Sequence, residues 1–120
     1  MKYDILIAEE SLTGRMTLRE IVRATGGSLR EVSDMAELEE QCRVGRPKLC
    51  IISMGFPEWR RDVVHKLKQI SPETRVILST DQQTSVLRIM DGIDAGAERN
   101  YLTKPYRRDE VKEIIAKTLS

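Results

Sequence analysis

The feature that most constrains this chain is a strict alternation of short apolar runs with amphipathic segments. The first apolar run, residues 3–8, is followed by Leu18, Ile21 and Val22 at helical spacing, and Gly26-Gly27 ends that segment. Four more pairs of this kind follow, with connections of a few residues. The pattern predicts a parallel sheet with helices on both faces.

The later strands are predicted at residues 28–33, 49–52, 75–80 and 100–103. Asp34 and Glu37 have capping-box spacing before the second helix. The apolar positions of the later helices are Met35, Leu38 and Cys42; Val63, Leu67 and Ile70; Val86, Ile89, Met90 and Ile93; and Val111, Ile114, Ile115 and Leu119. No repeat or linker interrupts the alternation, so we expect one domain over residues 1–120.

The charge balance argues against nucleic acid and membrane as direct partners. Lys and Arg number 20 against 19 Asp and Glu, and acidic residues accompany each basic cluster. Neither an 18-residue apolar run nor a signal-peptide pattern is present, so we expect a cytoplasmic protein. Cys42 and Cys50 are interpreted as buried reduced thiols, and the single His65 cannot by itself form a metal site.

Polar residues follow the predicted strands at the end where open parallel sheets bind ligands. Glu9-Glu10 follow the first strand, Ser53 the third, Thr80 ends the fourth, and Lys104 follows the fifth. These residues are the candidate site.

In these residues the sequence resembles the receiver domain of bacterial response regulators, over essentially the whole chain. The family has an acidic pair after the first strand, an aspartate ending the third with proline four residues on, and Ser or Thr ending the fourth. It also has an aromatic residue in the fifth strand, followed by Lys-Pro. Here these features correspond to Glu9-Glu10, Ser53 with Pro57, Thr80, Tyr101 and Lys104-Pro105. The resemblance implies a flavodoxin-like three-layer α/β/α sandwich with a five-stranded parallel sheet of order 2-1-3-4-5.

The departures from the family pattern concern its chemistry. In the family the third-strand aspartate accepts a phosphoryl group and binds Mg²⁺ together with the acidic pair. Ser53 offers a neutral hydroxyl in place of that carboxylate, and Glu9 and Glu10 are each a methylene longer than aspartate. We therefore expect a degenerate receiver, not an enzyme, with no cofactor, or with Mg²⁺ held weakly by Glu9 and Glu10.

Simpler interpretations of the same residues stay open. Lys104 could be a surface lysine, Thr80 a strand-end hydroxyl, and Tyr101 a half-buried strand aromatic. Glu9 and Glu10 could be helix N-terminal acids favoured by the helix dipole.

The predicted function is two-component signalling by protein–protein contact, with Lys104 settled on Glu9 or Glu10. By the resemblance, the fourth helix, fifth strand and fifth helix form the surface for a signalling protein, a fused output domain or a second copy. Its candidate residues are Tyr101, Pro105, Tyr106 and Arg107. One alternative is a phosphorelay receiver with Ser53 or Glu58 as acceptor. Another is a flavodoxin-like mononucleotide binder, for which a loop starting with two carboxylates is unfavourable.

Overall fold

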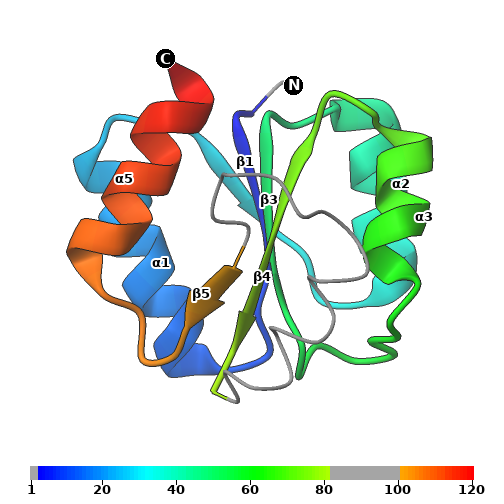
Figure 1. The fold of residues 1–120 in the computed structure, drawn as a ribbon, viewed down its shortest axis with the longest axis horizontal. Coiled ribbons are helices and arrows are strands. Elements are labelled where there is room, and N and C mark those ends of the chain that lie inside the picture. Colours follow the sequence, from blue (N-terminus) through cyan, green and yellow to red (C-terminus); the bar gives the residue numbers. More distant parts are fainter. Residues whose placement is uncertain (1–2, 82–100) are drawn as a thin grey trace.

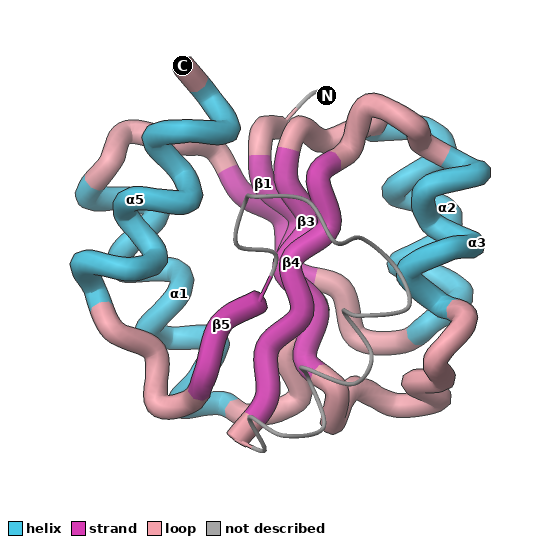
Figure 2. Tube along the Cα trace, viewed as in Figure 1, coloured by secondary structure: helices cyan, strands magenta, loops and turns pink. Residues whose placement is uncertain are grey.

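A computed structural model describes residues 3–81 and 101–120 (Figures 1 and 2). Its centre is a five-stranded sheet of order β2-β1-β3-β4-β5, and every neighbouring pair is parallel. The predicted fold class and strand order are thereby confirmed. The strands are β1 (Ile5–Ala8), β2 (Leu29–Glu31), β3 (Leu49–Ser53), β4 (Arg75–Thr80) and β5 (Tyr101–Thr103).

Helices cover both faces of the sheet. Figure 1 shows α1 and α5 on one side and α2 and α3 on the other. Their bounds are α1 (Leu12–Ala24), α2 (Met35–Gly45), α3 (Val63–Ile70) and α5 (Arg108–Leu119). The predicted helix marked by Val86 and Ile93 lies outside the described residues.

Alternate residues of each central strand enter opposite halves of the core. In β1, Ile5 and Ile7 pack on the side of α1 and α5, whereas Leu6 and Ala8 pack on the side of α2 and α3. All four side chains are fully buried, which explains why the strand reads as a continuous apolar run. Burying a side chain of this size stabilises the fold by about 1.5–3 kcal/mol. The predicted burial of Ile5, Ile7, Ile51, Ile52, Ile77 and Leu78 is confirmed.

Capping residues fix the starts of the first two helices. The Asp34 carboxylate accepts the Glu37 amide hydrogen at 2.8 Å, and the Ser11 hydroxyl accepts that of Gly14 at 3.2 Å. Such caps typically contribute about 1 kcal/mol. The Ser11 cap places the first turn of α1 directly after β1, at the carboxyl end of the sheet.

The third strand is one residue longer than the sequence predicts. Ser53 pairs in register with Ser79 of β4, and its side chain is almost fully buried. Its hydroxyl is therefore held by the sheet and not by a loose loop.

Two further sequence predictions concern the cysteines and membrane spans. Cys42 and Cys50 are both free and buried, as expected. Across the parts of the chain that the structure describes, no helix is long and apolar enough to cross a membrane.

Candidate functional site

The carboxyl ends of three strands bring a lysine, two glutamates and a serine together. The Lys104 ammonium donates to Ser53 Oγ at 2.7 Å and to Glu9 Oε2 at 3.0 Å. It also lies 3.0 Å from Glu9 Oε1 and 3.5 Å from Glu10 Oε2. The expected contact of Lys104 with the acidic pair is present.

Lys104 reaches this position because the sheet holds its backbone. Its amide donates to the Thr80 carbonyl at 2.9 Å, which continues the pairing of β5 with β4. Thr80 is itself largely buried at the end of its strand.

Glu9 is the buried anion of the site, with only 1% of its surface exposed. Its Oε2 accepts from the Ser11 amide at 3.0 Å as well as from Lys104. Its backbone carbonyl accepts from the Arg15 guanidinium at 3.2 Å. A buried carboxylate is tolerated only when it is paired and hydrogen-bonded, and Glu9 meets both conditions.

Tyr106 closes the site from the loop that precedes α5. Its hydroxyl lies 2.5 Å from Glu9 Oε1 and 2.7 Å from Ser79 Oγ. Burial, followed by the hydrogen bond to Glu9, raises the pKa of Tyr106 well above its usual value, so the phenol stays protonated. The sequence predicted Tyr106 on an output surface; the structure directs its hydroxyl into the pocket.

Glu10 is the more exposed of the two acids. Burial raises the pKa of Glu10, but interactions with the Glu9 and Ser53 side chains and the charge of Lys104 outweigh it. The net pKa therefore lies below the usual value, so Glu10 is a carboxylate at neutral pH.

Two glycines leave room for the longer acidic side chains. A Cβ atom added at Gly14 would lie 2.8 Å from the Glu9 Cδ and Oε1 atoms. One added at Gly55 would lie 2.2 Å from Glu10 Oε2. The extra methylene groups of the two glutamates are thus accommodated where neighbouring side chains are absent.

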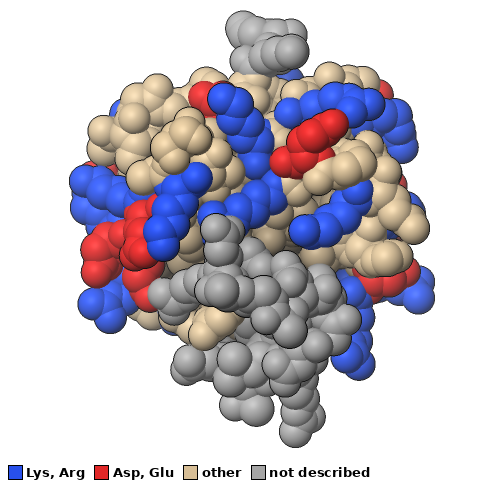
Figure 3. Space-filling view, turned by 45° about the horizontal axis from the view of Figure 1, so that its top comes forward, with Lys and Arg blue, Asp and Glu red and all other residues tan. Residues whose placement is uncertain are grey.

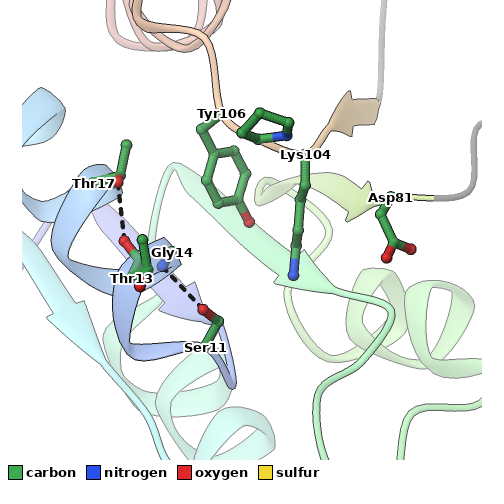
Figure 4. Close-up of a pocket in the computed structure, with 8 residues that line it drawn as sticks. Ser11, Thr13, Gly14, Thr17, Asp81, Lys104 and Tyr106 are labelled. Atoms are coloured by element: carbon green, nitrogen blue, oxygen red, sulfur yellow. Dashed lines mark hydrogen bonds between the residues drawn. The ribbon is translucent and has the colours of Figure 1, made fainter.

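A pocket of about 330 Å³ opens beside this cluster, between α1 and the loop after β5. Figure 4 shows Lys104 and Tyr106 along one wall and Ser11, Thr13, Gly14 and Thr17 along another. Asp81, directly after β4, also lines the pocket.

The remaining predicted residues lie outside the ionic cluster. Tyr101 is half-buried in β5 and pairs in register with Leu78. Pro105 lines the pocket, and Arg107 is exposed, 3.8 Å from Asp109. Glu58 lines a separate cavity together with Met35 of α2 and Lys66 of α3.

The donor set does not fit Mg²⁺ as the residues are arranged. Mg²⁺ requires near-octahedral oxygen ligands at about 2.0–2.1 Å. Both oxygens of Glu9 already accept hydrogen bonds, and the ammonium of Lys104 lies between the acids and Ser53. Within residues 3–81 and 101–120, His, Cys, Asp and Glu side chains form no group of three that could hold a metal ion.

The sequence analysis missed several participants: Ser79, the Tyr106 hydroxyl, the Ser11 amide, Arg15, and the glycines Gly14 and Gly55. Gly14 did carry a signal, because glycine costs about 1 kcal/mol relative to alanine inside a helix and therefore calls for a reason. Ser79 carried none, since a serine inside a strand run does not reveal a distant partner.

Comparison with known proteins adds independent findings. Residues 5–116 match the family model described as "Response regulator receiver domain". The chain is 30% identical to the chemotaxis protein CheY of Bacillus subtilis over the full length of both. It is also similar to a solved putative response regulator from Chloroflexus aurantiacus, with 21% identity, a TM-score of 0.81, and coverage of 99% and 98% of the two chains. A beryllofluoride-activated NtrC4 receiver domain dimer, 14% identical, gives a TM-score of 0.80 over 96% of this chain and 94% of that one.

Proposed function

Because the chain belongs to the response regulator receiver family, we propose that it is a two-component signalling module that acts by protein contact and accepts no phosphoryl group at Ser53. Receiver domains are generally non-catalytic signalling modules, and this one would keep the fold while lacking the acceptor. The observation that carries the proposal is the Ser53 hydroxyl. It lies where the resemblance places the acceptor aspartate, and it already accepts from Lys104 at 2.7 Å and from the Gly55 amide at 3.1 Å.

Ser53 lacks the base that a hydroxyl nucleophile needs. A serine attacks well only when a neighbouring group removes its proton. Lys104 is a proton donor here, and Glu10, with its lowered pKa, is a weak base. This arrangement disfavours phosphoryl transfer to the hydroxyl.

The two alternative functions find less support. Glu58 lies in the cavity between α2 and α3 and not beside Lys104, so an acceptor there would have no cation from this cluster. For a mononucleotide, the phosphate would meet Glu9 and Glu10, and the Ser11 amide is already used by Glu9.

The partner surface is proposed around the exposed start of α5, near Tyr101, Pro105 and Arg107. Exposed charges of both signs lie there, since Arg107 is 3.8 Å from Asp109 and Arg108 is 3.0 Å from Glu20. Figure 3 shows basic and acidic side chains mixed in the same way over the face of the molecule that it draws. A second copy of this chain is one candidate, because the solved NtrC4 receiver domain is a dimer. Gel filtration at several concentrations would detect it.

Incubation with acetyl phosphate and Mg²⁺, followed by intact mass measurement, tests the chemistry. We expect no added phosphoryl group, because position 53 lacks a carboxylate. A mass gain in the wild type that disappears in Ser53→Ala would overturn the proposal. A gain that instead disappears in Glu58→Gln would move the acceptor to the loop after β3.

Binding to a candidate partner tests the surface. Arg107→Ala should weaken the complex, whereas Lys117→Ala, at the other end of α5 and similarly exposed, serves as the matched control. Equal effects of the two substitutions would place the contact elsewhere.

A further inference from the structure

We infer that the Lys104 ammonium is the resident cation of this pocket, and that it takes the place of a divalent metal ion. The wild-type protein is therefore metal-independent at this site. The inference concerns cation binding alone, so it does not depend on whether Ser53 accepts a phosphoryl group.

The distances around Lys104 Nζ match an ammonium and not a metal. Four oxygens surround it: Ser53 Oγ at 2.7 Å, both Glu9 carboxylate oxygens at 3.0 Å, and Glu10 Oε2 at 3.5 Å. Three N–H donors on one ammonium can serve such a set.

Glu9 has no lone pair to spare for a metal without breaking the site. Its Oε1 accepts from Tyr106 and its Oε2 from the Ser11 amide, in addition to the contacts with Lys104. Turning this buried carboxylate toward another cation would leave the tyrosine hydroxyl and the helix amide without their acceptor.

The net charge of the cluster also disfavours a divalent ion beside Lys104. Two carboxylates and one ammonium leave the cluster with a formal charge of −1. A divalent ion added beside the ammonium would bring it to +1 around the buried carboxylate of Glu9, so a metal is favoured only if Lys104 leaves. Lys104 is tethered through its backbone bond to Thr80, which gives its ammonium a high effective concentration at the acids.

The two glycines leave the space in which both acids reach Lys104. Without the space at Gly14 and Gly55, neither glutamate could keep its present conformation. The lengthened carboxylates and the missing side chains therefore form one arrangement around Lys104 Nζ.

Mn²⁺ titration, followed by paramagnetic broadening of ¹⁵N amide signals, tests the inference without any phosphodonor. The readout is the amides of Ser11 and Gly55, which lie beside the acids. The proteins are the wild type, Lys104→Met, and Lys48→Met as the control, because Lys48 is an exposed lysine 3.9 Å from Asp4. In the wild type and the control, we expect no selective broadening up to about 1 mM, the weak end of oxygen-ligand sites.

Lys104→Met should bind Mn²⁺ at least about tenfold more tightly than the wild type. Equal Mn²⁺ binding by wild type and variant would overturn the inference, and so would binding by neither, because the oxygens would then not suit a cation. Lys104→Gln, which keeps a hydrogen-bond donor without the charge, replaces Lys104→Met if the latter does not fold.

Discussion

The two ends of the sheet bury polar side chains of different kinds. At the amino end, Ser71 and Thr74 are both buried, and the Thr74 hydroxyl donates to the Pro47 carbonyl at 2.6 Å. The Ser71 and Thr74 hydroxyls lie 2.6 Å apart. Charged groups near this end, such as Lys48 and Asp4, stay at the surface. At the carboxyl end, charged groups are buried as well: Glu9 and the inner part of Lys104 lie beside the buried hydroxyls of Ser53, Ser79 and Thr80.

The hydroxyl network at the amino end serves the fold, whereas the ionic cluster at the carboxyl end is not required by it. Neutral hydroxyls close a loop at little cost when each finds a partner. A buried ion pair is costly to desolvate, and well-packed apolar residues often replace it without loss of stability. The carboxyl end therefore holds an arrangement that the stability of the fold alone does not call for, whereas the amino end needs only the fold.

Among the substitutions that test this comparison, Lys104→Met should lower the free energy of unfolding most. It removes the cation next to a carboxylate that is 1% exposed, and breaking such a pair costs about 3 kcal/mol. Lys48→Met at the other end should cost less than about 1 kcal/mol. Urea unfolding at neutral pH in metal-free buffer measures both, and similar costs would remove the distinction between the two ends.

Gly14→Ala should have the next largest effect, although alanine favours helices. Its Cβ would meet Glu9, which is fixed by Lys104, Tyr106 and Ser11. We expect a loss of about 1–3 kcal/mol from overpacking.

Replacing Glu9 by the shorter aspartate in the Gly14→Ala protein tests whether crowding against Glu9 causes this loss. Glu9→Asp should cost less in the Gly14→Ala background than in the wild type, because the crowding methylene is gone. Gly55→Ala should be milder, since its contact is the end of the more exposed Glu10. Additive effects of Gly14→Ala and Glu9→Asp would show that the glycine serves another purpose.

Tyr106→Phe should have a smaller effect that depends on pH. At neutral pH it removes one donor to Glu9, which costs about 1–2 kcal/mol. The pKa of Tyr106 is raised in the folded protein, so its contribution is complete below the unfolded value of about 10 and falls as pH rises beyond it. Between pH values of about 10 and 11, wild-type stability should fall by about 1 kcal/mol more than that of the variant. Parallel curves would mean that the hydroxyl is not buried against Glu9.

The sequence predicted the sheet and the position of the site, but not every side chain within the site. Strands such as residues 49–52 were predictable because burial on both faces requires a continuous apolar run. The cluster of Glu9, Ser53 and Lys104 was predictable because parallel strands bring their carboxyl ends to one edge. The role of Tyr106 was not, since a residue between a strand and a helix can turn either way, and the turn depends on the partner that it finds.

The most direct test of the account is an NMR titration of the ¹⁵N-labelled protein with beryllofluoride and Mg²⁺, a phosphoryl mimic with its metal. The central claim is that Lys104 is committed to Glu9 and Ser53, and that the pocket has no carboxylate at position 53 for the mimic. We predict unchanged amide signals for Ser11, Gly55 and Tyr106. A saturable shift of these signals that is absent in Lys104→Met would show that Lys104 still binds a phosphoryl group. That result would contradict the central claim.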